Sequence, residues 1–210
     1  MSQAESVDRL IAGELQAHFA CATIGRQIIV LEQTGSTNDA IVEFATANSN
    51  EGLVLFAEHQ TAGRGQRGNK WESAAGKGLW FSILLRPKIK INDSGQLTTW
   101  AIEAIADLIR TEFSLKPAIK LPNDVQLQGR KVAGVLVEMR AQQKKPHLAI
   151  VGIGINVNHS LEDFPPELQE RAISLVMALH RPVDRQKFAV ALLQNLDRTY
   201  RARFVPADAR

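Results

Sequence analysis

The sequence has little of several features that mark whole classes of protein. A single cysteine, Cys21, excludes an internal disulfide bond and a zinc site built from cysteines. The five histidines lie far apart, without the i, i+4 pair that places two metal ligands on one helix face, so we expect no metal site built by the protein alone. No stretch approaches the about 18 apolar residues of a membrane span, and the acidic residues near the N-terminus are unlike a signal peptide. A reducing cytoplasm fits these absences best.

The charge balance is nearly even. The formal net charge of +3 suits an anionic ligand or an acidic protein partner, but it is too small to argue for DNA binding. With 210 residues, of which 45% are hydrophobic, the chain can bury one good-sized core. We therefore expect a single domain over residues 1–210 and no membrane partner.

The spacing of apolar residues predicts strands that often follow one another directly. We expect strands at residues 27–32, 52–60, 78–86 and 147–158, and a hairpin turn at "QGRK" between segments 118–127 and 129–140. Helical spacing occurs at residues 5–19, from Ser36 to Ala47, at 94–113 and from Asp184 to about Arg203. This order predicts an α+β fold with a mixed, largely antiparallel central sheet and flanking helices, instead of a doubly wound parallel sheet.

The stretch "GRGQRGNKW" (63–71) matches the G-x-G-x-x-G pattern of dinucleotide-binding folds, but its context is wrong. In those folds the glycines open a helix whose N-terminal N–H groups hold pyrophosphate. Here Gly76 and Gly78 interrupt any helix, and the acidic residue expected about 20 positions further on is absent. The P-loop pattern also fails, because Gly78 stands after Lys77 where serine or threonine is required. Both nucleotide-fold interpretations are rejected.

What remains is a glycine-rich loop that carries Arg64, Arg67 and Lys70 and ends in Trp71. Such a loop can bring backbone N–H groups and a guanidinium to an anion, and an indole can cover a purine. The alternative is a solvated basic turn. Local chemistry does not decide between them.

Two further segments carry candidate functional residues. "KLPNDVQLQGRKVAGVLVE" (120–138) supplies the positive charges of Lys120 and Lys131, and its Asp124 can orient a nucleophile or accept its proton. In "VGIGINVN" (151–158), Gly152 and Gly154 leave two bare positions on one face of a strand, which costs stability unless a ligand or another backbone comes close.

Together with "STND" (36–39), whose simpler interpretation is a helix cap, these segments resemble in order the catalytic domain of biotin protein ligases. The resemblance covers a core of about residues 24–204. It implies the fold shared with class II aminoacyl-tRNA synthetases. It also implies ATP-dependent activation of biotin to biotinoyl-5′-AMP, with Mg²⁺ on the ATP phosphates. The second reaction is transfer of biotin to a lysine of a biotin carboxyl carrier protein, such as that of acetyl-CoA carboxylase.

The resemblance also assigns roles to individual positions. The biotin-binding set is Ser36, Thr37, Asn38, Gln60, Gly63, Arg64, Gly65, Gln66, Lys131, Gly134, Gly152 and Gly154. The residues for ATP and the adenylate are Arg64, Trp71, Lys120, Asn123, Lys131 and Asn156. The catalytic set is Lys131, Asp124 and Arg64, with Arg64 and Lys131 screening the repulsion between two anions and Asp124 serving the incoming lysine.

The sequence departs from the family pattern at several points. Gln66 stands where many members have a second arginine, and Leu121 replaces the tryptophan of "KWPND". The loss of the guanidinium predicts a weaker hold on the adenylate. The segment before the first family strand is too short for a winged DNA-binding domain, and the small C-terminal β domain common in the family is missing. We therefore expect no DNA binding. The sequence does not indicate the oligomeric state, for which the resemblance implies either a monomer or a homodimer.

Two alternatives stay open at this point. A lipoate or octanoate ligase or transferase shares the catalytic fold, although the octanoyl transferases need a nucleophilic cysteine and Cys21 lies outside every motif. A non-catalytic binding module would keep the pocket without the chemistry, against which the presence of Arg64, Asp124 and Lys131 argues.

Overall fold

The computed structural model describes residues 8–19, 23–45, 51–142 and 147–206. Cys21 lies outside this part of the chain. The strands are β1 (Gln27–Thr34), β2 (Leu53–Gln60), β3 (Gly78–Leu85), β4 (Ala118–Lys120), β5 (Asp124–Leu127), β6 (Arg130–Arg140) and β7 (Leu148–Asn156). The helices are α1 (Ala12–Gln16), α2 (Thr37–Phe44), α3 (Gly95–Phe113), α4 (Leu175–Leu179) and α5 (Arg185–Phe204), with short 3₁₀ turns at η1 (Gln66–Gly68), η2 (Ile91–Asp93) and η3 (Pro166–Leu168).

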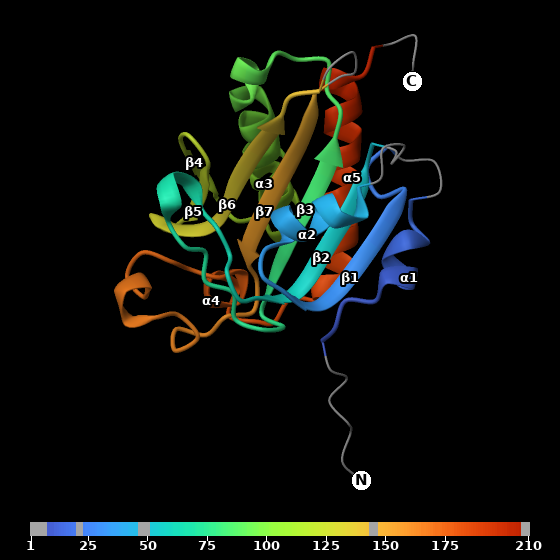
Figure 1. Ribbon diagram of the computed structural model, residues 1–210. Coiled ribbons are helices and arrows are strands. Elements are labelled where there is room, and N and C mark those ends of the chain that lie inside the picture. Colours follow the sequence, from blue (N-terminus) through green and yellow to red (C-terminus); the bar gives the residue numbers. More distant parts are fainter. Residues whose placement is uncertain (1–7, 20–22, 46–50, 143–146, 207–210) are drawn as a thin grey trace.

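The strands form one seven-stranded sheet in the order β1-β2-β3-β7-β6-β5-β4. Only β1 and β2 pair in parallel, and every other neighbouring pair is antiparallel. The predicted α+β class with a mixed, largely antiparallel sheet is confirmed. The parallel pair is joined through α2, which crosses one face of the sheet (Figure 1).

The two faces of the sheet are covered differently. The long helices α3 and α5 pack side by side on one face, and α2 lies on the other (Figure 1). Because successive residues of a strand point to opposite faces, the strands are divided between two cores. Val54 and Phe56 belong to the large core under α3 and α5, whereas Leu53 and Leu55 pack with Ile41 of α2. The short α2 covers little of its face, so part of the sheet beside it is left to the loops.

Most predicted elements are confirmed, and their ends have local causes. At the predicted hairpin, Gln128 and Gly129 both have positive φ, as a two-residue turn between antiparallel strands requires. The final helix begins after Asp184, whose side chain accepts a hydrogen bond from the backbone N–H of Lys187 at 2.9 Å. The helix predicted from Ser36 to Ala47 ends earlier, at Phe44, and residues 46–50 are not described.

The helix predicted over residues 5–19 is wrong in length. Within the described residues it is helical only over α1, and residues 8–11 are not helical. The backbone N–H of Leu10 donates to the Glu58 carboxylate at 2.7 Å, and that of Ile11 donates to Gln186. Tertiary partners on β2 and α5 therefore hold this segment against its helical pattern.

Among the residues that the structure describes, no helix has the length and apolar character of a membrane span.

Candidate functional site

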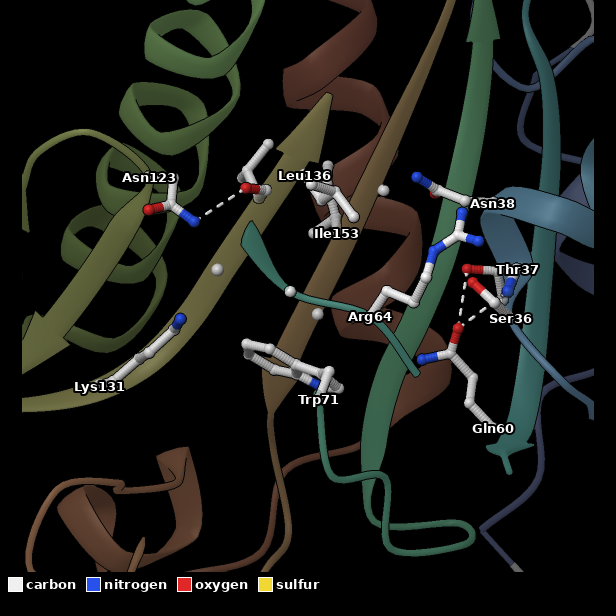
Figure 2. Close-up of a pocket in the computed structure, with 15 residues that line it drawn as sticks. Ser36, Thr37, Asn38, Gln60, Arg64, Trp71, Asn123, Lys131, Leu136 and Ile153 are labelled. Atoms are coloured by element: carbon white, nitrogen blue, oxygen red, sulfur yellow. Dashed lines mark hydrogen bonds between the residues drawn. The ribbon is translucent and has the colours of Figure 1, made fainter. Parts of the chain in front are cut away.

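A pocket lies on the face of the sheet that α2 only partly covers. Its cavity volume is about 40 Å³, well below the roughly 300–1,000 Å³ of drug-sized ligand sites, and the Trp71 ring in its wall packs against Gly134 and Gly154. Its walls are Ser36, Thr37, Asn38, Gln60, Arg64, Gly65, Trp71, Asn123, Lys131, Gly134, Val135, Leu136, Gly152, Ile153 and Gly154. Figure 2 shows Ser36, Thr37 and Asn38 at one side and Lys131 and Asn123 at the other, with Arg64 and Trp71 between them. All four segments singled out in the sequence meet here.

Polar groups at the α2 end of the pocket are fixed by hydrogen bonds to one another. Gln60 Oε1 accepts from the Thr37 backbone N–H at 2.8 Å and from the Thr37 hydroxyl at 3.1 Å. The buried Ser82 hydroxyl lies 2.8 Å from Thr37 Oγ1 and 2.6 Å from Asn38 Oδ1. Ser36 precedes α2 but makes no side-chain cap, so the capping interpretation of "STND" is wrong for its first residue. These side chains form a preorganised polar wall.

The strand glycines make room for side chains that come from other segments. A Cβ on Gly152 would lie 2.3 Å from Asn38 Oδ1, and a Cβ on Gly154 would lie 2.5 Å from the Trp71 ring. The Trp71 ring also packs on Gly134, where a Cβ would come within 2.8 Å of it. The sequence predicted close approach by a ligand or a backbone; in the structure, an amide and an indole are the groups that come close.

Lys131 lines the far end of the pocket and forms an ion pair with Asp124, which lies outside the pocket wall. Lys131 Nζ lies 2.7 Å from Asp124 Oδ1 and 5.0 Å from the centre of the Trp71 ring, a cation–π distance. The Lys131 backbone is held on both sides, since its N–H donates to Arg171 O and its carbonyl accepts from Ile173 N. Both partners are partly exposed, so the pair remains reachable from solvent.

Arg64 contacts protein carboxylates instead of projecting a free charge. Its Nη1 lies 2.8 Å from Asp39 Oδ2, and its Nη2 lies 3.0 Å from Glu138 Oε1 and 3.1 Å from Oε2. Glu138 also accepts a hydrogen bond from Asn38 Nδ2 at 2.9 Å. The sequence interpretation of Arg64 as a grip for a ligand anion did not include these two carboxylates.

Several predicted site residues lie outside the pocket wall. Gly63 and Gln66 line a second, adjoining depression formed by residues 60–72 and 136–138. Lys120 faces Asp124 across the β4–β5 pair. Asn156 is buried, and its side-chain amide donates to the backbone carbonyls of Lys131 and Ile173. In this structure Asn156 anchors the segment that carries Lys131.

Sequence analysis missed some residues of the site. The apolar wall formed by Val135, Leu136 and Ile153 is indistinguishable in the sequence from ordinary strand residues. Asp39 lies in "STND", for which the sequence indicates only a helix cap, and Glu138 ends "VLVE", for which it indicates no role. For Glu138, the sequence offers one indication: a carboxylate at the end of an apolar strand, in a protein with an arginine in a glycine-rich loop.

Trp71 packs at one end of a row of four aromatic side chains. Trp71 meets Trp80 edge to face at 5.9 Å between ring centroids, Trp80 meets His159 at 5.6 Å, and His159 stacks on Phe164 at 4.9 Å. Burial lowers the pKa of His159 to about 4, so its ring is neutral at pH 7. The indole that borders the pocket therefore rests on rigid, uncharged packing.

The chain is similar in sequence to known proteins. Residues 30–156, more than half of the chain, match the biotin/lipoate A/B protein ligase family. The "Bifunctional ligase/repressor BirA" of Bacillus spizizenii is 35% identical over 193 residues, covering 92% of this chain and 59% of the relative. The "Biotin--[acetyl-CoA-carboxylase] ligase" of Mycobacterium tuberculosis is 36% identical over 177 residues, covering 82% of this chain and 63% of the relative. The chain thus spans less than two thirds of the length of both relatives.

Solved structures show the same fold. The biotin protein ligase from Aquifex aeolicus in complex with biotin and ATP superposes with a TM-score of 0.71 at 32% identity, covering 85% of this chain and 73% of the other. The chain therefore belongs to the biotin/lipoate A/B protein ligase family.

Proposed function

We propose that this protein is an ATP-dependent biotin protein ligase. It activates biotin as biotinoyl-5′-AMP and transfers it to a lysine of a carrier protein. The observation that carries the proposal is the pocket in which the hydroxyl and amide groups of residues 36–38 and Gln60 lie across from the Lys131–Asp124 pair. A relative of 32% identity was solved with biotin and ATP. The name of the mycobacterial relative supports the carrier of acetyl-CoA carboxylase as the acceptor.

The first reaction joins two anions. A biotin carboxylate oxygen attacks the α-phosphorus of ATP, a P–O bond forms, and pyrophosphate leaves with the electron pair of the broken bond. Lys131 is the cation placed to screen this repulsion, because its ammonium lies at the pocket wall and its backbone is fixed by two hydrogen bonds. The polar wall at the α2 end is suited to hold the uncharged ureido end of biotin by hydrogen bonds.

The second reaction needs an unprotonated amine. The carrier lysine attacks the carbonyl carbon of the mixed anhydride, the amide bond forms, and AMP leaves. Asp124 is placed to orient this amine or to take its proton, because its carboxylate is partly exposed and lies 2.7 Å from the ammonium of Lys131. The ion pair thus brings the residues proposed for both reactions together.

Magnesium is proposed to arrive with the ATP phosphates. Within the described residues, no group of three or more His, Cys, Asp or Glu side chains could hold a metal ion. Mg²⁺ is usually bound through one or two carboxylates, water and substrate phosphates, and the carboxylates near the pocket are consistent with that mode. When bound, it would spread the charge that develops on the phosphate oxygens.

Exchange of labelled pyrophosphate into ATP tests the first reaction. We expect exchange that depends on biotin and is not supported by lipoate or octanoate. A protein that exchanges only with lipoate or octanoate would be a ligase for those acids, and a protein inactive with every acid would be a binding module. Either result would refute the proposal.

Asp124→Asn is expected to separate the two reactions. Because the amide cannot accept the amine proton, transfer to the carrier should fall by about a hundredfold. Adenylate formation should fall by less than about tenfold, since Lys131 keeps its charge. Single-turnover assays of each reaction measure the two rates, and Asp107→Asn on the exposed side of α3 is the matched control. Equal loss of both reactions would rule out the role given to Asp124.

Gln66→Arg is expected to slow the release of biotinoyl-adenylate. A guanidinium here adds a charge-assisted hydrogen bond to the phosphate side of the intermediate, which corresponds to about tenfold slower release. Gln66 lies in the depression that adjoins the pocket. Rapid dilution of preformed complex into unlabelled biotin and ATP measures the rate. Asn69→Arg adds the same charge elsewhere in the loop, and an equal effect of both variants, or none, would remove this role of position 66.

A further inference from the structure

One carboxylate, that of Glu138, contacts both the pocket wall and the glycine-rich loop. Glu138 lies in β6, and its Oε2 accepts from Asn38 Nδ2 at 2.9 Å on α2. The same carboxylate accepts from Arg64 Nη2 at 3.0 and 3.1 Å. The Glu138 side chain therefore connects β6 to α2 and to the glycine-rich loop, which are far apart in the sequence.

Arg64 has a second carboxylate partner on α2. Its Nη1 lies 2.8 Å from Asp39 Oδ2. One guanidinium thus bridges the helix and the strand on either side of the pocket, and its donors are directed at protein oxygens. The side chains of Arg64, Asp39 and Glu138 are 40%, 55% and 35% exposed, so each pair is partly screened by water.

The loop itself is internally ordered and has few other ties to the sheet. Gly65 N donates to Asn69 O at 2.7 Å, and Trp71 N donates to Gly63 O at 3.0 Å, which makes the loop a small closed unit. At its start, Ala62 N donates to Gly35 O. Beyond that point, the packing of Trp71 and the ion pairs of Arg64 hold the loop to the sheet.

We infer that Glu138 and Asp39 are positioning residues that keep the loop closed over the pocket by engaging Arg64. Arg64 acts as a clasp between the loop and the domain, and Glu138 at the same time fixes the amide of Asn38. The inference rests on the proposed function only for its effect on biotin. The clasp itself consists of protein side chains only.

The clasp affects binding through the fraction of protein in which the loop is closed. If ligand binds the closed form, the apparent dissociation constant equals the intrinsic constant divided by that fraction. An exposed ion pair shifts such an equilibrium by about two- to fivefold. Loss of the clasp should therefore raise the apparent KM for biotin by that factor and speed escape of the intermediate. In variants of Glu138 and Asp39 the rate constant of adenylation at saturation should change little, because neither carboxylate lines the pocket.

The substitutions can separate charge from hydrogen bonding. Glu138→Gln removes the charge that Arg64 engages but keeps an oxygen that can accept from Asn38. Asp39→Asn removes the other charge, and Arg64→Gln removes the clasp from the loop side. Glu43→Gln is the matched control, since Glu43 lies exposed on the same helix as Asp39.

Exposure of Trp71 in the ligand-free protein tests the clasp without any assumption about the substrate. The protein has three tryptophans, so labelling with 5-fluorotryptophan gives three ¹⁹F signals, and the fully buried Trp80 and Trp100 serve as internal references. We expect the open fraction reported by Trp71 to rise about two- to fivefold in Arg64→Gln, Glu138→Gln and Asp39→Asn, and to stay unchanged in Glu43→Gln. High salt should reproduce the effect in the unmodified protein and have less effect in Arg64→Gln.

The effect of combining two substitutions tests whether Arg64 and Glu138 act through each other. If Arg64 and Glu138 act through each other, the double variant should be no more open than Arg64→Gln alone. Additive effects, or a Trp71 signal that Arg64→Gln leaves unchanged, would overturn the inference. An effect on the KM for biotin in Glu138→Ala but not in Glu138→Gln would assign Glu138 to Asn38 alone and also overturn it. Absence of biotin-dependent exchange in the unmodified protein would refute the proposed function, while the ¹⁹F measurement would still test the clasp.

Discussion

Lys131→Ala is expected to lower the rate of adenylate formation by about a hundred- to a thousandfold. The substitution removes the ammonium that lies at the pocket wall beside Asp124, so the approach of a carboxylate to the α-phosphate is no longer screened. It also leaves the Asp124 carboxylate without its partner, which adds repulsion. Biotin-dependent pyrophosphate exchange measures the loss, with saturating biotin and ATP to separate the rate constant from binding.

The fold should survive this substitution. The hydrogen bonds of Lys131 to Arg171 and Ile173 are made by backbone atoms, which alanine retains. Lys116→Ala, at an exposed position before β4, is the control for loss of one positive charge. A thermal unfolding midpoint close to that of the unmodified protein, together with less than a threefold loss of exchange, would contradict the role given to Lys131.

Arg185→Met is expected to lower the free energy of unfolding by about 3–5 kcal/mol. Arg185 is 0% exposed, and its guanidinium contacts Glu58 at 2.7 Å, Asp8 at 3.1 Å and the carbonyl of Gly78 at 3.0 Å. Methionine fills part of the volume but leaves the Glu58 carboxylate buried without its cation. Urea unfolding measures the loss as a lower midpoint at unchanged slope.

Two variants check this interpretation. Glu58→Leu combined with Arg185→Met should regain part of the stability, because no buried charge remains unpaired. Arg203→Met removes an arginine that pairs with Glu103 on the surface, where both side chains are substantially exposed, and should cost ~1 kcal/mol or less. Equal costs for Arg185→Met and Arg203→Met would show that the buried pair contributes no more than a surface pair.

The strands could be predicted well where the apolar run is continuous. Segments 52–60, 78–86 and 147–158 match β2, β3 and β7 almost to the residue, because both faces of these strands are covered and their composition leaves little ambiguity. Residues 8–11 could not be predicted, since Glu58 and Gln186 are distant in sequence from the N–H groups that they bind. Helical spacing says nothing of such partners.

The site could be predicted as a set of positions but not as a set of contacts. The resemblance to biotin protein ligases identified Gln60, Trp71 and Lys131, all of which line the pocket. It did not indicate that Lys131 pairs with Asp124, or that Arg64 is engaged by two carboxylates. The sequence does not show which opposite charge the fold brings near a charged residue, and the role of that residue depends on this partner.

The bare glycine positions have a consequence for substrate range. Gly134 and Gly154 are direct partners in the β6–β7 register, and Gly152 lies two residues along the same strand. The floor of the pocket is therefore main chain, and the Asn38 amide and the Trp71 ring lie directly against it. A side chain added at any of these positions would first meet those two groups, because a Cβ would lie 2.3 Å from Asn38 at Gly152, and 2.5 and 2.8 Å from Trp71 at Gly154 and Gly134. A change of substrate range is thus tied to the loop and to α2, since a substitution in the floor displaces Trp71 or Asn38 before it reshapes the pocket.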